Sequence, residues 1–182
     1  MKRLILISGD LASGKSSLAD SLSLLLNVPA FKKDVIKEKY CDEIGYETRE
    51  ENRKLSIMAM EYMINAFKNF AINGQEIILE ANFREEELNS IKEISDKYQY
   101  DVVFFLLRGE MEDLYDRFMK RLPHRHRAHI SLHLDESIDR FKDYVLGQRN
   151  IDYPFIPHII NTSKHDQKET LEIAKSYLFI KN

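Results

Sequence analysis

The sequence predicts an α/β fold: a single domain built on a five-stranded parallel sheet with helices on both faces. Short continuous apolar runs, typical of strands buried on both faces, alternate with segments whose apolar residues recur at helical spacing. A glycine-containing turn joins the first apolar run, residues 4–7, to the first helical segment, residues 17–27. Strands that alternate with helices in this way specify a parallel sheet with right-handed crossovers.

In the first half of the chain, leucines recur at helical spacing over 17–27, and a short second strand follows over 28–31. The next helix, 34–46, contains Gly45 near its end, where glycine is favoured. A long helix is predicted over 49–72, because an apolar stripe runs along it and Asn73-Gly74 stops it.

The second half continues the alternation. The predicted strands are 76–80, 101–107 and 155–161, and the first two are almost wholly apolar. The predicted helices are 85–98, 110–122, 135–146 and 167–178, with Gly147 behind the third of these. A basic segment separates the helix at 110–122 from the helix at 135–146, and we call residues 122–133 the lid.

Composition sets the class of protein. A chain of 182 residues with 31% charged and 43% apolar residues is expected to form one soluble domain, 1–182. No apolar run approaches membrane-spanning length, and Met1-Lys2-Arg3 leads directly into a strand, so a cytoplasmic protein is expected. Cys41 is the single cysteine, which excludes an internal disulfide and predicts a buried or half-buried thiol on a helix. The net charge of −3 argues against long nucleic acid as a partner.

Residues 9–16 match G-x-x-x-x-G-K-[ST], the phosphate-binding loop of nucleoside-triphosphate enzymes. The glycines let successive N–H groups converge on phosphate oxygens, and the helix start adds its positive dipole end. Lys15 is expected to reach the β- and γ-phosphates of ATP, and the Ser16 hydroxyl to ligate Mg²⁺. The predicted nucleotide-binding residues of this stretch are Gly9, Asp10, Leu11, Ala12, Ser13, Gly14, Lys15, Ser16 and Ser17.

Asp34 follows the second strand, on the sheet edge where ligands bind in such folds. We interpret it as the carboxylate that accepts a proton from the phosphoryl acceptor; the alternative is a plain helix N-cap. Lys37, one turn on, either binds the acceptor or is a solvated lysine. Glu80 ends the third strand and could orient a Mg²⁺-bound water or an acceptor hydroxyl, or be a paired structural acid. Asn82 and Arg84 follow and either contact the acceptor or shape the turn.

The segment from Arg117 to Leu134 carries five Arg or Lys residues, four histidines and no acid. Arg117 and Arg121 are four residues apart, share one helix face and are expected to bind the nucleotide. In the lid, Arg125 is the arginine we assign to catalysis, because arginine forks neutralise charge on a transferring phosphoryl group. The alternative is that the basic run is only a solvated face.

With these residues in place, the chain resembles the P-loop kinases, whose ATP-binding domain is of the AAA type. The resemblance is to the zeta-toxin-like, chloramphenicol-phosphotransferase-like and polynucleotide-kinase-like subgroup. There an Asp follows the second strand as the base and a basic residue one turn later contacts the acceptor, and Asp34 and Lys37 match these positions. Residues 125–129 look like an Arg-His-x-Gly-His lid signature with Ala128 in place of the glycine. Acceptors differ across the subgroup, so the resemblance implies a reaction type only.

These observations predict an ATP-dependent phosphotransferase, a kinase that transfers the γ-phosphoryl group to a hydroxyl of a small-molecule acceptor. A nucleoside-monophosphate or polynucleotide 5′-hydroxyl kinase is the alternative, because the basic lid favours a phosphorylated acceptor. A nucleotide-binding switch or an ATPase acting on a protein partner has less support. The third strand ends in Leu-Glu-Ala-Asn and lacks the Asp-Glu pair of hydrolytic motors, and no Asn-Lys-x-Asp motif is present. The acceptor, ATP against GTP, and the oligomeric state stay open.

Overall fold

Five parallel strands form one sheet in the computed structural model, which describes residues 2–130 and 132–179. The strands are β1 (Arg3–Gly9), β2 (Ala30–Lys32), β3 (Ile77–Glu80), β4 (Asp101–Arg108) and β5 (Pro157–Asn161). Their order across the sheet is β2-β3-β1-β4-β5, and every neighbouring pair is parallel. The α/β class and the five-stranded parallel sheet predicted from the sequence are confirmed. Ser131, inside the predicted lid, lies outside the described residues.

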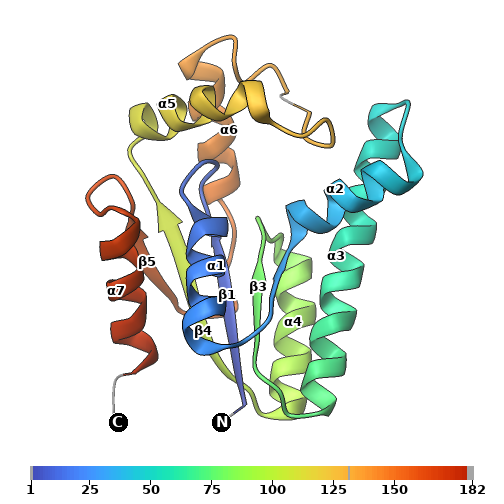
Figure 1. Ribbon diagram of the computed structural model, residues 1–182, viewed down its shortest axis with the longest axis vertical. Helices are drawn as coiled ribbons and strands as arrows, with labels where there is room; N and C mark the ends of the chain where they lie inside the picture. Colours follow the sequence, from blue (N-terminus) through green and yellow to red (C-terminus); the bar gives the residue numbers. More distant parts are fainter. Residues whose placement is uncertain (1, 131, 180–182) are drawn as a thin grey trace.

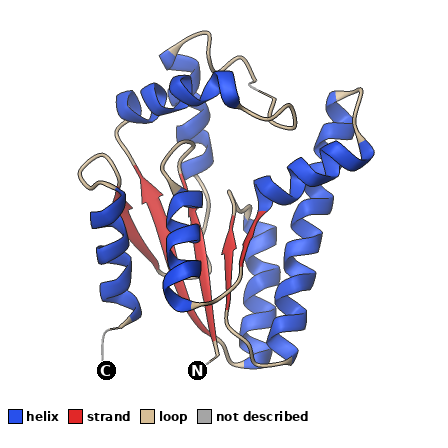
Figure 2. Cartoon of the chain, in the orientation of Figure 1, coloured by secondary structure: helices blue, strands red, loops and turns tan. Residues whose placement is uncertain are grey.

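Helices cover both faces of this sheet (Figure 2). They are α1 (Lys15–Leu26), α2 (Lys33–Ile44), α3 (Arg49–Ile72), α4 (Glu85–Tyr98), α5 (Met111–Arg121), the short 3₁₀ helix η1 (Leu122–His124), α6 (Ile138–Arg149) and α7 (Gln167–Leu178). Alternate residues of β1 serve the two faces, as the period of a strand requires. Leu4 and Leu6 pack in the core under α3 and α4, whereas Ile5 and Ile7 pack in the core under α1 and α7.

Most helix boundaries follow their caps. Thr48 forms a capping box with Glu51 at the start of α3, and α3, α4 and α7 have the bounds that the sequence predicted. The boundaries predicted for α6, 135–146, are wrong by three residues at each end. The helix begins later because the Ser137 side chain accepts the N–H of Arg140 as its N-cap, and it continues through Gly147 to Arg149.

The carboxyl ends of β1, β3 and β4 point toward a group of elements that lies above the sheet (Figure 1). On one side of this edge lie α5, α6 and the lid, and on the other lies the pair α2 and α3. Cys41 is buried on α2, as predicted. Among the described helices, none combines the length and the apolar character needed to cross a bilayer.

Candidate active site

The phosphate loop, residues 9–16, takes its shape from two glycines with positive φ. At Gly9 φ is +136°, and a Cβ atom there would lie 2.0 Å from the carbonyl oxygen of Leu107 on β4. At Gly14 φ is +90°, and nothing lies within 4 Å of the Cβ position. Gly9 is therefore required by close packing against β4, whereas Gly14 is required by its backbone conformation alone.

The start of α1 is left open for an anion. Gly14 is the N-cap of this helix, and no side chain caps its first turn. Free N–H groups at a helix start, together with the positive end of the helix dipole, form an anion-binding site. Within the described part of the chain, the Ser13 hydroxyl oxygen is buried and has no hydrogen-bond partner. Both observations fit a bound phosphate chain.

Lys15, Ser16 and Glu80 form the polar centre of the site. Lys15 Nζ donates to the carbonyl oxygens of Asp10 at 2.7 Å and Gly9 at 3.1 Å. Burial lowers the pKa of Lys15, and the negative charge of Glu80 opposes that shift. Ser16 Oγ donates to Glu80 Oε2 at 3.0 Å, and burial raises the pKa of this carboxyl group. A hydroxyl beside a carboxylate is an oxygen donor set that suits Mg²⁺.

A cavity of about 250 Å³ adjoins the phosphate loop. Ser13 and Gly14 of the loop line it on one side, and Arg117 and Arg121 of α5 line it on another. Arg117 is held by the loop after β5, because its Nη1 and Nη2 donate to Thr162 Oγ1 at 3.2 Å and to the Thr162 carbonyl at 2.7 Å. The structure thus brings both arginines of α5 to the same cavity as the phosphate loop.

Asp10 is turned away from the loop interior. Its carboxylate, 1% exposed, accepts hydrogen bonds from Arg108 Nη1 at 3.0 Å and from the Gly109 N–H at 3.1 Å. Arg149, at the end of α6, adds Nε at 3.0 Å and Nη2 at 2.6 Å. The backbone N–H of Asp10 donates to the Leu107 carbonyl at 2.9 Å. The structure therefore shows Asp10 as the anchor that ties the phosphate loop to β4 and α6.

Asp34 is the second residue of α2 and is exposed. The N-cap of α2 is Lys32, which has an extended backbone and no capping side chain, so Asp34 does not cap this helix. Burial lowers the pKa of Lys15 and of Arg125, and the charge of Asp34 opposes both shifts. Asp34 follows β2, whose last residue, Lys32, pairs with Glu80 of β3, so its backbone lies at the same edge of the sheet as the phosphate loop.

Lys37 is buried and already has a partner. Its Nζ donates to Asn52 Oδ1 on α3 at 2.8 Å, and Asn52 Nδ2 donates in turn to the carbonyl of Ala128 in the lid at 2.9 Å. Burial lowers the pKa of Lys37, and the charge of Asp34 opposes that shift. Lys37 is thus neither a solvated lysine nor an unpaired cation; in this structure it links α2, α3 and the lid.

The residues that follow β3 point to different places. Glu80 lies at the phosphate loop, as described above. Asn82 lines a second, small cavity together with Asp10 and Gln148, and its Oδ1 is buried without a hydrogen-bond partner in the described part of the chain. Arg84 is exposed at the N-cap of α4. The structure therefore groups Glu80 with the phosphate loop but does not place Asn82 beside Asp34.

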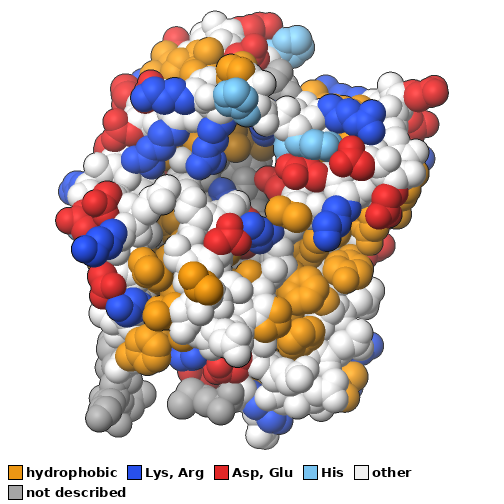
Figure 3. Space-filling model, in the orientation of Figure 1, with side chains coloured by type: hydrophobic (Ala, Val, Ile, Leu, Met, Phe, Trp, Pro, Cys, Tyr) orange, Lys and Arg blue, Asp and Glu red, His pale blue; other side chains and the backbone are white. Residues whose placement is uncertain are grey.

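The lid lies against α2. Arg127 Nη2 donates to the Cys41 carbonyl at 3.1 Å, and His129 Nε2 lies 2.7 Å from Glu38 Oε1. Ala128 is fully buried in a cluster with Cys41 and Leu55, so its methyl group fills an apolar contact that a glycine would leave empty. In Figure 3, Lys and Arg side chains gather over α5, above a hollow in this face of the molecule.

Two residues near the site were not identified from the sequence. Tyr144, on α6, is half-buried; burial raises the pKa of its hydroxyl, and the charges of Arg125, Asp34 and Arg84 also act on it. Arg149 holds Asp10 across 139 positions of sequence. Neither belongs to a short motif, and α6 gave only an amphipathic pattern, so no local signal marked them.

The family follows from a comparison of the sequence with family models. The model described as "AAA domain" matches residues 5–143, which include the phosphate loop, Asp34, Glu80 and the whole lid. The chain belongs to the AAA domain family. For an AAA domain with an intact phosphate loop, nucleotide binding is implied. A search of curated proteins finds no match to this chain.

Solved structures with the same architecture include proteins described as kinases. A candidate kinase from Chloroflexus aurantiacus J-10-fl is 20% identical, with a TM-score of 0.80 over 96% of this chain and 97% of that one. A gluconokinase from Sinorhizobium meliloti 1021 is 13% identical, with a TM-score of 0.61 over 95% and 89%. A shikimate kinase from Bacteroides thetaiotaomicron is 18% identical, with a TM-score of 0.58 over 97% and 96%. At these identities the likeness is one of fold.

Proposed function

We propose that this protein is an ATP-dependent P-loop kinase that transfers the γ-phosphoryl group to a hydroxyl of a small-molecule acceptor. The observation that carries the proposal is the position of Asp34, an exposed carboxylate two residues after β2, whose last residue pairs with Glu80, the residue hydrogen-bonded to Ser16 of the phosphate loop. In phosphoryl transfer, a carboxylate next to the γ-phosphate accepts the proton of the attacking hydroxyl. The structural likeness to a gluconokinase and a shikimate kinase is consistent with a small acceptor.

In the proposed reaction, separate residues bind the triphosphate, hold Mg²⁺, accept the proton and neutralise charge. The N–H groups at the start of α1 and Lys15 hold the triphosphate, and Ser16, with Glu80 through a water, would hold Mg²⁺. Mg²⁺ neutralises charge on the β- and γ-phosphates. The acceptor oxygen forms a bond to the γ-phosphorus as the bond to the bridging oxygen of ADP breaks, and the hydroxyl proton passes to Asp34. Arg121 lies close enough to act on the Lys15 charge and balances the remaining negative charge.

The test is the pair Asp34→Asn and Asp96→Asn, assayed with labelled ATP and a panel of polyols, sugar acids, nucleotides and 5′-hydroxyl oligonucleotides. Asp34→Asn is expected to lower turnover about 10²- to 10⁴-fold while calorimetric affinity for Mg·ATP stays within about threefold, because a general base is lost and the phosphate loop is intact. Asp96 pairs with Lys92 on the exposed side of α4 and serves as the control. Unchanged turnover in Asp34→Asn would remove Asp34 from its role, and no Mg·ATP binding by the wild type would remove the kinase.

A nucleoside-monophosphate or polynucleotide kinase is the second candidate, because cations favour a phosphorylated acceptor. Two cations, Arg84 and Arg125, both influence the Tyr144 hydroxyl. The resemblance to the zeta-toxin-like and polynucleotide-kinase-like subgroup agrees with either candidate. Added salt separates them for nucleic acid, because an oligonucleotide held through several phosphates loses affinity steeply as salt rises. A flat salt response, or transfer only to compounds without a nucleotide, excludes this second candidate.

A further inference from the structure

Three arginines follow one another at four-residue spacing along α5 and η1, and each has a different neighbour. Arg117 is hydrogen-bonded to Thr162, and both residues line the 250 Å³ cavity. Arg121 lines the same cavity, and its charge lowers the pKa of Lys15. Arg125 does not line that cavity, and the groups whose charges act on it are Asp34 and Tyr144. Arg117 and Arg121 thus lie at the nucleotide cavity, whereas Arg125 lies outside it, in the lid that packs against α2, the helix that carries Asp34.

The guanidinium of Arg125 is fixed in position, but one of its N–H donor groups has no hydrogen-bond partner in the described residues. It lies over the ring of Phe118, 5.3 Å from the ring centre, which fixes its position. Its Nη1 is buried and has no hydrogen-bond partner, and no carboxylate in the described residues lies within salt-bridge distance of it. A buried charged donor without a partner is costly, and a ligand that supplies an acceptor oxygen offsets that cost.

Arg84 is the second cation of this region. It is exposed at the start of α4, whose first turn lies next to the first turn of α2, with Glu87 Oε1 3.9 Å from Lys33 Nζ. Burial raises the pKa of the Tyr144 hydroxyl, and the charges of Arg125 and Arg84 oppose that shift. Within the described residues the side chain of Arg84 forms no ion pair with a carboxylate. Lys37 does not add to this set, because its ammonium is bonded to Asn52. The acceptor side thus combines the carboxylate of Asp34 with two guanidinium groups that form no ion pair within the described residues, while the nearby Glu87 carboxylate accepts the backbone N–H of Arg84 and lies 3.9 Å from Lys33.

We propose that the acceptor is a small hydroxyl compound that carries an anionic group, a carboxylate or a phosphate monoester, bound by Arg125 and Arg84. The hydroxyl to be phosphorylated faces Asp34, and the anionic group lies at the Tyr144 end of the same space. A neutral polyol would leave Arg125 Nη1 unpaired, whereas two carboxylate or phosphate oxygens match the guanidinium fork. This inference rests on the proposed kinase function and specifies its substrate class.

The experiment measures binding first and transfer second. Protein saturated with Mg²⁺ and a non-hydrolysable ATP analogue is titrated calorimetrically with matched sets of equal carbon number, each containing a polyol, the corresponding sugar acid and the sugar phosphate. Sets of three to seven carbons cover the range of small acceptors. We expect an anionic member of at least one set to bind about 10- to 100-fold more tightly than its neutral counterpart. The carboxylate and phosphate arms show which anion is preferred.

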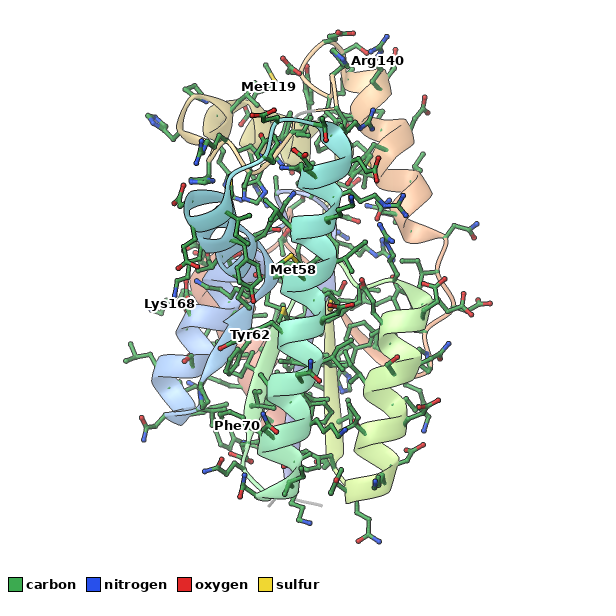
Figure 4. All side chains as sticks on the ribbon, turned by 90° about the vertical axis from the view of Figure 1, so that its right-hand side faces the viewer. Met58, Tyr62, Phe70, Met119, Arg140 and Lys168 are labelled. Atoms are coloured by element: carbon green, nitrogen blue, oxygen red, sulfur yellow. The ribbon has the colours of Figure 1, made fainter. Side chains whose placement is uncertain are left out.

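Variants connect this preference to the arginines. Arg125→Gln and Arg84→Gln are each expected to weaken binding of the anionic compound about 10-fold or more and to leave Mg·ATP affinity unchanged. Arg125→Lys keeps the charge but loses the fork, so it is expected to recover part of the loss. Arg140, exposed on α6 at the far end from β1 (Figure 4), provides the matched control Arg140→Gln. Because Arg84 is exposed, its variant reports on the site even where the Arg125 variant disturbs the lid.

Three results of these titrations would contradict the proposed anionic acceptor. Equal or tighter binding of the neutral member, absence of binding by every anionic compound, or unchanged anion affinity in both glutamine variants overturns the inference. Labelled ATP then separates the two proposals. Transfer to neutral compounds alone keeps the kinase and removes the anionic acceptor, whereas arginine-dependent binding of an anion without transfer to any compound removes the kinase.

Discussion

Gly9 and Gly14 are the two glycines of one motif, but the structure requires them for different reasons. Alanine substitution at each position distinguishes these two reasons. Gly9→Ala is expected to lower the free energy of unfolding by about 3 kcal/mol, because a Cβ atom would lie 2.0 Å from the Leu107 carbonyl oxygen. Gly14→Ala meets no atom within 4 Å, so only the positive φ opposes it, at about 1 kcal/mol.

The two readouts are thermal unfolding and calorimetric affinity for Mg·ATP. Gly9→Ala should show mainly a drop in Tm, about 2 to 4 °C for each kcal/mol in a chain of this size. Gly14→Ala should show mainly weaker triphosphate binding, since Gly14 shapes the turn that presents the N–H groups of α1. Equal losses of Tm in the two variants would contradict the distinction.

Glu80 gives a prediction with a defined sign in pH. Burial raises the pKa of Glu80, so the folded protein holds this proton more tightly than the unfolded chain does. Stability from this group is therefore complete below the ordinary pKa of 4.5 and is lost as pH rises toward the folded pKa. Glu80→Gln does not ionise, so its Tm relative to the wild type should rise with pH above 4.5.

The same variant should lose activity. Ser16 Oγ donates to Glu80 Oε2, and an altered partner behind a Mg²⁺-ligating hydroxyl typically costs about 10- to 100-fold in activity or metal affinity. Phosphoryl transfer is measured against Mg²⁺ concentration at pH 7 and 8, and unfolding is followed from pH 4 to 8. A Tm difference that stays constant across this range, or full activity at low Mg²⁺, would count against the assignment.

For single residues, the sequence was informative where the residue acts within its own motif. Gly9, Gly14, Lys15 and Ser16 occupy one turn, and the pattern that identifies them also fixes their neighbours. Asp10 belongs to the same turn, and its predicted contact with nucleotide stays a prediction. The bond of its carboxylate to Arg149 was not predicted, because a partner 139 positions away leaves no trace in local spacing.

Among the elements, α6 links the lid to the phosphate loop, and Arg149 at its end makes the link. Arg149→Met removes Nε and Nη2 from the Asp10 carboxylate, which is 1% exposed, and leaves it with Arg108 and the Gly109 N–H. A partly unpaired buried charge is expected to cost about 2 kcal/mol and to weaken Mg·ATP binding, because Asp10 anchors the loop. Arg140→Met, on the same helix and exposed, is the control. The role of Arg149 is refuted if the two variants have the same Tm and ATP affinity.

The elements themselves were largely predictable. Helices α3, α4 and α7 have the predicted bounds because caps and turn residues mark both ends, as Thr48 and Asn73 do for α3. For α6 the sequence analysis placed the start at Asp135 and the end before Gly147, whereas the helix starts after Ser137 and ends at Arg149. Tertiary contacts decide between them, since Tyr115 donates to the Asp135 carbonyl outside the helix and Arg149 is held by Asp10 beyond Gly147.

In the whole molecule, two parts meet above the carboxyl ends of the strands: α2 with α3 on one side, and α5, α6 and the lid on the other (Figure 1). Asp34 comes from the first part, and Arg125 and Tyr144 come from the second. The parallel α/β topology predicted that residues that follow the strands, such as Asp34 and Glu80, gather at one edge. It did not predict their partners, because the contact between the two parts depends on side chains such as Asn52 that lie in no motif.

Asn52 is a buried residue that joins these two parts, in addition to the contacts of Arg127 and His129 with α2, so its removal tests how they act together. Asn52→Ala leaves the Lys37 ammonium and the Ala128 carbonyl without their hydrogen bonds of 2.8 and 2.9 Å, at a cost of about 2 to 4 kcal/mol. The lid should open locally, so hydrogen exchange of amides 125–129 is expected to accelerate more than that of β1 and β4. Acceptor affinity should fall while Mg·ATP affinity is kept, because Arg125 belongs to the lid and Lys15 does not.

Asn69→Ala, exposed on the same helix, is the control. Uniform acceleration across the sheet would mean that Asn52 supports the fold as a whole, and unchanged exchange at 125–129 would mean that it does not hold the lid.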